Sequence, residues 1–258
     1  MPDRDMEVSL TTPDLVTVSN ALLGFLSITY VVDGRFFSAS LLIVICVGLD
    51  GLDGFLARRL DVEHDMGAYL DFFSDMISFC FAPAVLLYST FYEIQLGRAW
   101  QSPQNALATI VPFLIVFFGT MRLTRFADKT FTQKIYNGLP APCLALLVVH
   151  LTYLLGWGST GWNYPNLTLL VILGFSLLLY SPIRYPKLRG AKLRMGAAVF
   201  IALTLTGILL IYFARNEAKV FLLFTLVGLI GYVFLGPLMV VDNDERKRGD
   251  NRKDGDGR

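Results

Sequence analysis

The sequence has few charged residues and few of the side chains that bind soft metals. Charged residues make up 17% of the 258 positions, and the formal net charge is +1. The net charge by itself says nothing about a nucleic-acid partner, but the sequence has no long basic patch outside the expected loops, so we expect no such partner. The chain has three cysteines, none of them in a CxxC pair. An odd number of isolated cysteines argues against a disulfide framework, and we expect buried, reduced thiols.

Apolar residues, in contrast, are abundant. They make up 54% of the chain, and the mean hydropathy is +0.55. Several stretches approach the ~20 residues that a helix needs to cross a bilayer, and they lack the alternation of barrel strands. We predict an all-α, polytopic integral membrane protein with about eight transmembrane helices. The expected spans are about 15–32, 36–57, 68–92, 105–126, 140–156, 165–181, 191–213 and 218–241.

Lysine and arginine are distributed unevenly between the two sets of loops. If the N-terminus is cytoplasmic, 18 of these residues lie on the cytoplasmic side and 4 on the other side. Positive residues concentrate in cytoplasmic loops, so we predict that both termini lie inside. We therefore expect a multi-pass protein of the cell (plasma) membrane whose segment 50–75 faces the cytoplasm.

Four carboxylates stand at the end of one apolar stretch and the start of the next. Asp50 and Asp53 are three residues apart and share one helix face, and Asp71 and Asp75, four apart, share another. Acids within apolar spans are costly and indicate function. Four clustered carboxylates repel one another unless a cation is present. Hard oxygen donors suit Mg²⁺, Mn²⁺ or Ca²⁺, and we predict a site for one or two such ions that bind a phosphate or diphosphate.

Small and basic residues surround these acids. Gly54 and Gly67 remove side chains where a substrate would approach the backbone, and Arg58 offers a planar fork for phosphate. The alternative is that Asp50 and Asp53 form salt bridges with the basic residues at the helix end. That alternative leaves the other two acids without partners.

The pattern Asp-x2-Asp-Gly-x2-Ala-Arg-x8-Gly-x3-Asp-x3-Asp resembles the signature of the CDP-alcohol phosphatidyltransferase family. The resemblance implies a metal-dependent enzyme, with two Mg²⁺ or Mn²⁺ ions, in which an alcohol attacks the diphosphate of a CDP-linked lipid and CMP is released. It assigns the metal ions to the four acids and the role of general base to Asp75. It implies contacts with the CDP moiety for Asn20, Gly54, Ala57, Arg58 and Gly67.

Four further segments are similar to runs in the phosphatidylserine synthases of this family. They are Ser78–Ala84, Arg122–Phe126, Asn137–Pro142 and Ser181–Pro186. Cys80, Thr124 and Ala127 depart from the family pattern. The resemblance implies transfer of a phosphatidyl or archaetidyl group to L-serine, in phospholipid biosynthesis.

Two pairs of residues are candidates for contacts with the acceptor. Arg122 and Arg125 lie at the cytoplasmic end of the fourth span and offer guanidinium groups for the serine carboxylate or the lipid phosphate. Alternatively, both are ordinary positive residues of a cytoplasmic loop. Gly138 and Pro140 either shape the acceptor pocket or only start the next helix.

The expected domain organisation follows from the same resemblance. A six-helix membrane domain would cover 1–190, two further transmembrane helices 191–241, and a charged, disordered cytoplasmic tail 242–258. Members of the family are generally dimers, so a homodimer surrounded by membrane lipids is expected. The alternative acceptors are inositol phosphate and glycerol phosphate. Two other classes of protein fit less well. An intramembrane prenyltransferase does not explain the glycine and arginine positions, and a divalent-cation transporter does not explain acids clustered at one face.

Overall fold

The protein is described from a computed structural model. The residues that the structure describes are 11–60, 65–98, 100–127, 136–157, 164–185 and 191–255. Nearly all of them are helical. The elements in chain order are α1 (Thr12–Val32), α2 (Phe36–Leu60), α3 (Asp65–Asp75), the π-helix η1 (Met76–Phe81), α4 (Ala82–Phe91), the 3₁₀-helix η2 (Ile94–Leu96), α5 (Pro103–Ala127), β1 (Tyr136–Asn137), α6 (Ala141–Thr152), the π-helix η3 (Tyr153–Trp157), α7 (Pro165–Leu178), β2 (Arg184–Tyr185), α8 (Ala191–Phe213) and α9 (Arg215–Gly255).

The apolar helices match the predicted spans. Five segments are long and apolar enough to cross a membrane: Thr12–Val32, Phe36–Leu56, Met66–Phe91, Pro103–Arg125 and Asn216–Leu238. Three shorter apolar helices cover Ala141–Trp157, Pro165–Leu178 and Ala198–Ile211. The helical fold with several candidate membrane spans is therefore confirmed.

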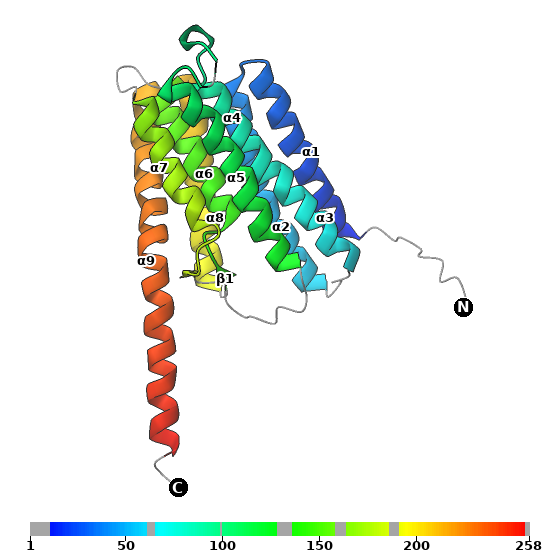
Figure 1. The fold of residues 1–258 in the computed structure, drawn as a ribbon. Coiled ribbons are helices and arrows are strands. Elements are labelled where there is room, and N and C mark those ends of the chain that lie inside the picture. The colour runs from blue at the N-terminus through cyan, green and yellow to red at the C-terminus, as the bar shows by residue number, and fades with distance from the viewer. Residues whose placement is uncertain are drawn as a thin grey trace, which may run out of the picture.

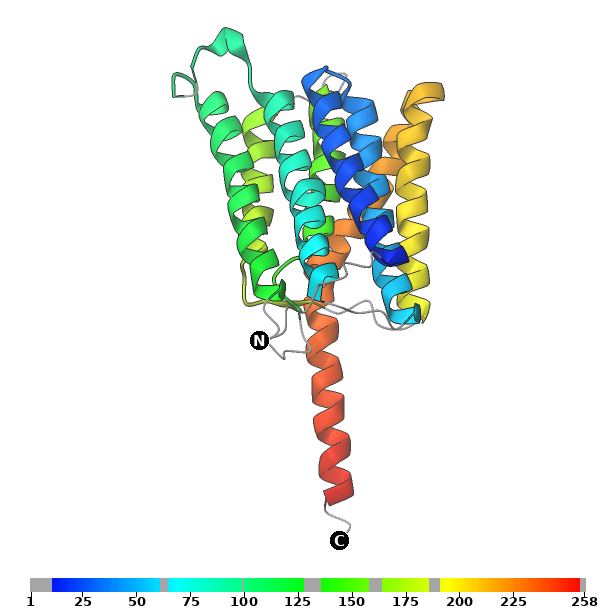
Figure 2. The same ribbon diagram turned by 90° about the vertical axis from the view of Figure 1, so that its right-hand side faces the viewer.

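The helices form a bundle around α6 (Figure 1). Ten of the twelve residues of α6 are buried, and its apolar side chains pack against α2, α4, α7 and α9. Helix α1 packs along α2 and α3, and α8 packs on α2 and α9. Seen from the side, α5 and α8 stand at opposite edges of the bundle, with α1 and α3 between them (Figure 2). The last two helices thus pack directly on the core helices.

The two ends of α1 show how local chemistry sets where a helix begins and ends. A capping box of Thr11 and Asp14 starts α1, because the Asp14 carboxylate accepts the Thr11 N–H at 2.7 Å. At the other end Gly34 has a φ of 71°, and the N–H of Arg35 donates to the Tyr30 carbonyl at 2.8 Å. Glycine adopts this left-handed conformation at little cost. The chain therefore reverses within three residues, and α2 begins at Phe36.

Two features differ from the predictions. Residues 136–137 and 184–185 pair as a two-stranded antiparallel sheet, so the chain is not purely α-helical. Helix α9 continues through Asp242 to Gly255, where a disordered tail was expected. Extending an existing helix avoids the cost of nucleation, and some acids of this segment stand four residues before a basic residue, as Asp242 does before Arg246. At 41 residues, α9 is about 60 Å long and extends well beyond the other helices (Figure 1).

Candidate active site at the acidic end of the bundle

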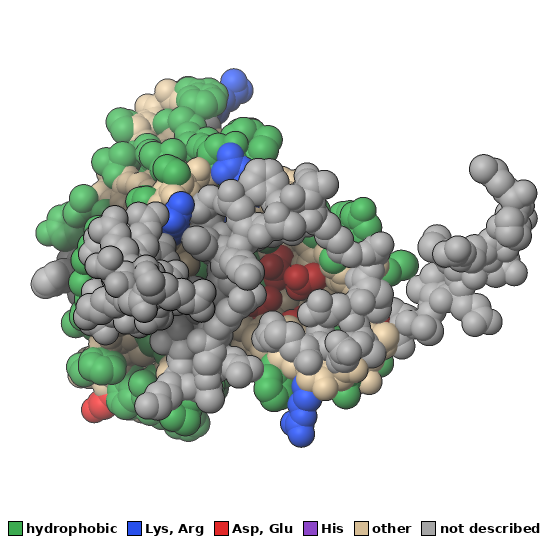
Figure 3. All heavy atoms as spheres, turned by 90° about the horizontal axis from the view of Figure 1, so that it is seen from below, with side chains coloured by type: hydrophobic (Ala, Val, Ile, Leu, Met, Phe, Trp, Pro, Cys, Tyr) green, Lys and Arg blue, Asp and Glu red, His purple; other side chains and the backbone are tan. Residues whose placement is uncertain are grey.

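The predicted acids meet at one end of the bundle, where α2 ends and α3 begins. Asp50, Asp53 and Asp71 each place one carboxylate oxygen within 4.8 Å of the others. Viewed from this end, acidic side chains gather in a hollow of the surface (Figure 3). The helix spacing of three residues in α2 brings the first two acids together, and the antiparallel α3 supplies the third. The predicted convergence of α2 and α3 acids is thus observed for three of the four.

The fourth acid, Asp75, lies one helical turn deeper. Its charge interacts with those of Asp50, Asp71 and Asp53 and with the positive charge of Arg122. Its Oδ1 is buried and has no hydrogen-bond partner among the described residues. A buried carboxylate oxygen is costly without a partner. Asp75 therefore lies beside the three-acid cluster with one oxygen open to a ligand.

These donors fit a hard divalent cation. Two oxygens bound to one Mg²⁺ at about 2.1 Å lie at most about 4.2 Å apart, and the limit is about 4.8 Å for Ca²⁺ at about 2.4 Å. The ligand oxygens of the three acids lie within 4.8 Å of one another, which is the limit for Ca²⁺. These carboxylates belong to the ligand class that Mg²⁺, Mn²⁺ and Ca²⁺ prefer. The open oxygen of Asp75 adds a further donor close by. The cluster is consistent with the metal site that the sequence predicts.

Helix α1 forms hydrogen bonds with both acid-bearing helices, α2 and α3. The Thr17 hydroxyl donates to Asp53 Oδ2 at 2.9 Å. From the third span, Ser74 donates to the Thr17 carbonyl at 3.0 Å and Ser78 donates to the Asn20 carbonyl at 3.1 Å. Sequence analysis missed Thr17 and Ser74. The available signal was their spacing, since Thr17 and Asn20 share one face of α1, and the two serines, four apart, share one face of the third span.

The residues predicted to contact CDP surround this junction. Asn20 is 1% exposed, and its side-chain oxygen has no hydrogen-bond partner among the described residues. Gly54 lies in α2 and Gly67 in the first turn of α3, both half-buried. The backbone of Ala57 and Arg58 belongs to α2, but their side chains lie outside the described residues. Contact of these residues with CDP stays a prediction.

A π-helix follows Asp75 immediately. Within η1 the chain makes i→i+5 hydrogen bonds, and the N–H of Ala82 donates to the Ile77 carbonyl. Pro83 has no N–H and cannot donate to the carbonyl four residues earlier, which favours a break in the regular pattern here. Cys80, on this π-helix, packs so closely on Gly119 of α5 that a Cβ at position 119 would collide with its sulfur. The predicted motif Ser78–Ala84 is therefore the site of a wide helical turn next to the acids.

The two candidate arginines, Arg122 and Arg125, lie in different surroundings. Arg122 is 6% exposed, and its charge acts on Asp75, Cys80 and Cys143. The Arg125 side chain is exposed, and its guanidinium lies 3.5 Å from the centre of the Tyr180 ring. The sequence left either arginine open as a ligand of the serine carboxylate and favoured Arg125 for this role. The structure places Arg122 toward the acids and Arg125 against the end of α7.

Gly138 and Pro140 connect the start of α6 with the end of α7. Gly138 has a φ of 89°, and its N–H donates to the Ile183 carbonyl at 2.8 Å. A Cβ at this position would collide with the Leu179 carbonyl oxygen. The Pro140 carbonyl accepts from the N–H of Leu144 at 3.3 Å at the start of α6. Both residues thus have a structural role at this rim, and a role in acceptor binding stays a prediction.

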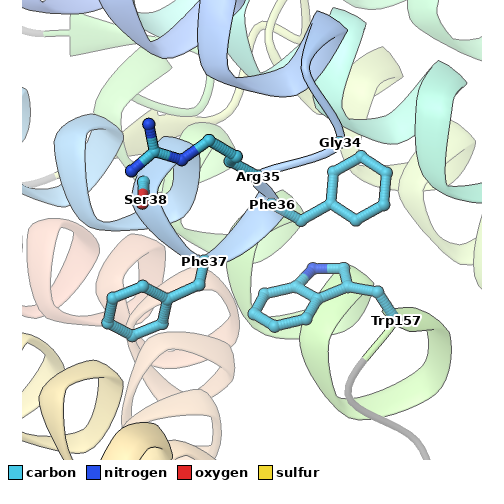
Figure 4. A pocket seen from close by; sticks show the side chains of 6 residues that line it. All are labelled: Gly34, Arg35, Phe36, Phe37, Ser38 and Trp157. Carbon is cyan, nitrogen blue, oxygen red and sulfur yellow. The ribbon is translucent and has the colours of Figure 1, made fainter.

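A second hollow lies at the opposite end of the bundle, around the turn between α1 and α2. It measures about 340 Å³ and is lined by Gly34, Arg35, Phe36, Phe37, Ser38 and Trp157 (Figure 4). The Phe36 and Trp157 rings face each other with centroids 6.3 Å apart. The guanidinium of Arg35 lies 4.4 Å from the centre of the Tyr30 ring. This lining contains no carboxylate, whereas the acids gather at the other end of the bundle.

Comparison with known proteins agrees with the site. The model of the CDP-alcohol phosphatidyltransferase family matches residues 10–180. The chain therefore belongs to this family of transferases, which act in phospholipid synthesis. It is 34% identical over 202 residues to the archaetidylserine synthase of Methanothermobacter thermautotrophicus, covering 77% of each chain.

Other relatives are named for the same acceptor. The chain is 35% identical over 230 residues to a CDP-diacylglycerol–serine O-phosphatidyltransferase of Helicobacter pylori, covering 86% of this chain and 91% of the relative. A protein of the same name from Methanocaldococcus jannaschii is 32% identical over 224 residues, covering 87% and 95%. These two relatives are named for transfer to serine, and the Methanothermobacter relative is named for the synthesis of archaetidylserine.

Proposed function

We propose that the protein transfers the phosphatidyl or archaetidyl group of a CDP-activated lipid to the hydroxyl of L-serine and releases CMP. The observation that carries the proposal is the convergence of Asp50, Asp53 and Asp71 beside Asp75, whose Oδ1 is buried, in a chain whose relatives are named for serine transfer. The reaction needs a basic group for the acceptor hydroxyl and a site for diphosphate at one place. The acids at this end of the bundle would supply the base and, with bound divalent ions, the site for the diphosphate.

Each residue would have a distinct task. Asp50, Asp53 and Asp71, with Asp75 adjacent, would hold two Mg²⁺ or Mn²⁺ ions. Such ions, when bound, neutralise the diphosphate and the charge that develops on the leaving CMP. Asn20, Gly54, Ala57, Arg58 and Gly67 would bind the CDP moiety. This assignment follows the family motif, and the burial of Asn20 and the half-buried glycines support it.

Asp75 would act as the general base. The serine oxygen attacks the lipid-side phosphorus, and its proton passes to the Asp75 carboxylate. The bond between this phosphorus and the bridging oxygen breaks, and CMP leaves with that oxygen. A carboxylate in hydrogen-bond reach of the hydroxyl is suited to this step. The open oxygen of Asp75 supports the assignment, since a substrate hydroxyl could donate to it.

Arg122 is the better candidate of the two arginines for the serine carboxylate. It is buried, and its charge acts on Asp75. An acceptor held by its carboxylate at Arg122 would have its hydroxyl on the side of the base. Arg125, stacked on Tyr180, would then stabilise the rim of the site. The distribution of lysine and arginine supports a cytoplasmic location of this end. A homodimer stays a prediction.

One assay tests the proposal. Purified protein is incubated with Mg²⁺ or Mn²⁺, with CDP-diacylglycerol or CDP-archaeol, and with serine, inositol phosphate or glycerol phosphate. We expect CMP release with serine and an absolute requirement for the divalent ion. Release with either phosphate acceptor and none with serine would refute the assignment. Asp75→Asn should lower turnover by about 10²–10⁴-fold while CDP-lipid still binds; retained turnover would remove Asp75 as the base.

A further inference from the structure

Thr17 of α1 contacts one of the acids directly. The residue is 6% exposed, and its hydroxyl lies 2.9 Å from Asp53 Oδ2 and 3.1 Å from the Pro13 carbonyl oxygen. A hydroxyl has one proton to donate, and an ionised carboxylate is the stronger acceptor. The second contact, to the carbonyl four residues earlier, is typical of a threonine rotamer in a helix. The rotamer therefore directs the hydroxyl at Asp53.

The backbone of Thr17 is hydrogen-bonded to α3, the other helix that carries acids of the cluster. Ser74 is 1% exposed and donates to the Thr17 carbonyl at 3.0 Å. Ser74 lies between Asp71 and Asp75 in α3. One residue of α1 thus binds Asp53 of α2 through its hydroxyl and the acidic segment of α3 through its carbonyl. A carboxylate held at one oxygen loses rotational freedom, and its plane stays fixed relative to the acids of α3.

We propose that Thr17 is a positioning residue that fixes the carboxylate of Asp53 for divalent-cation binding. The inference rests on the metal site of the proposed function. Hydrogen bonds from an outer shell orient metal ligands, and their removal typically weakens metal binding 10–100-fold. Without this bond the Asp53 carboxylate would become ordered only when the metal binds. The side-chain entropy lost at that point would weaken metal binding.

The chain offers a matched control at Ser27. Its hydroxyl donates to the Ala39 carbonyl at 3.0 Å, and it is fully buried. This bond also joins α1 to α2, but ten residues further along α1, about 15 Å from Thr17 along the helix axis. Removal of either hydroxyl weakens the contact between α1 and α2. Only the Thr17 variant changes the surroundings of an acid.

The experiment is an Mn²⁺ titration of detergent-solubilised protein without substrate, in which electron paramagnetic resonance reports free Mn²⁺. We expect Thr17→Val to weaken binding 10–100-fold, and Thr17→Ser, which keeps the hydroxyl, to stay within about threefold of the wild type. Ser27→Ala should bind Mn²⁺ as the wild type does. The melting temperature of each variant in chelator reports any general loss of stability, so that a weak Mn²⁺ signal from an unfolded sample is recognised.

Three results would overturn the inference, and they differ in scope. If Thr17→Val binds Mn²⁺ within twofold of the wild type while Asp53→Asn loses binding, the metal site stands and only the role of Thr17 falls. If Asp53→Asn binds Mn²⁺ as tightly as the wild type, the metal site itself is refuted, and the proposed function fails with it. Equal weakening by Thr17→Val and Ser27→Ala would also overturn the inference, since the effect would then be general loosening of α1.

Discussion

Neutralising Asp50 should stabilise the protein in the absence of metal and remove its stabilisation by Mn²⁺. The ligand oxygen of Asp50 lies within 4.8 Å of those of Asp53 and Asp71. Two unit charges at this distance repel by about 3.5 kcal/mol at an effective dielectric constant of 20 and by about 0.9 kcal/mol in bulk water. Because Asp71 is exposed and proton uptake relieves the repulsion, we expect a gain near the lower end, about 1–2 kcal/mol, from Asp50→Asn.

Thermal unfolding in detergent micelles measures this effect. Cys46 and Cys80 are buried and Cys143 is half-buried, so a thiol-reactive fluorophore reports unfolding. In chelator, Asp50→Asn should raise the melting temperature by about 2–6 °C. In saturating Mn²⁺ the wild type should gain stability and the variant should not, because a ligand that binds only the folded state stabilises it.

The control is Asp33→Asn, which removes an exposed acid at the turn after α1, at the end of the bundle away from the cluster. We expect no change of the melting temperature in either condition. A lower melting temperature for Asp50→Asn in chelator would refute the reasoning, because it would show that the acids do not repel one another in the folded protein. An undiminished gain from Mn²⁺ in the variant would refute the assignment of Asp50 as a ligand.

Three further predictions concern the surroundings of the site. Arg122→Gln should raise the KM for serine at least tenfold with a smaller change for the CDP-lipid, and Arg125→Ala should change both by less than about threefold. Gly138→Ala should lower the free energy of unfolding by about 1–3 kcal/mol, because alanine is strained at a φ of 89°. Thr225→Val should cost about 1–3 kcal/mol, because it leaves Nε2 of the buried His150, now 2.8 Å from the threonine hydroxyl, without a partner.

Each of these predictions has an outcome that contradicts it. A larger serine effect from Arg125→Ala than from Arg122→Gln would reverse the assignment of the two arginines. An unchanged melting temperature of Gly138→Ala would show that the rim accommodates a Cβ. For Thr225→Val the matched control is Thr206→Val, since Thr206 is exposed and bonds only within its own helix among the described contacts. Equal effects of the two valine variants would show that the bond to His150 contributes nothing.

The positions of the helices could be predicted because apolar runs of this length have few alternatives. Even the third span was predicted as one segment, and it is continuous over Met66–Phe91 although it contains Pro83. The acid pairs could likewise be placed on two facing helices, because residues three and four apart share a helix face. Their convergence needed only a short connection between α2 and α3.

The remaining features depend on contacts between distant parts of the chain. Thr17 and Asp53 are 36 residues apart, and a threonine in an apolar helix gives no local sign of such a partner. The depth of Asp75 depends on how α3 is rotated against α1 and α5. The difference between Arg122 and Arg125 depends on the position of α7, which brings Tyr180 beneath the second guanidinium. The local sequence pattern around these residues contains no information about such long-range contacts.

The π-helix η1 makes the length of the third span as important as its composition. A π-turn contains one more residue than an α-turn. The wide turn takes up this residue, so the halves on either side keep nearly the phase of a regular helix. A further residue inserted between Asp75 and Pro83 would rotate one half against the other by about 100°. The half that carries the acids packs on α1, and the half after η1 packs on α5, α1 and α6, so both could not keep their contacts, and we expect this segment to tolerate substitutions far better than an insertion.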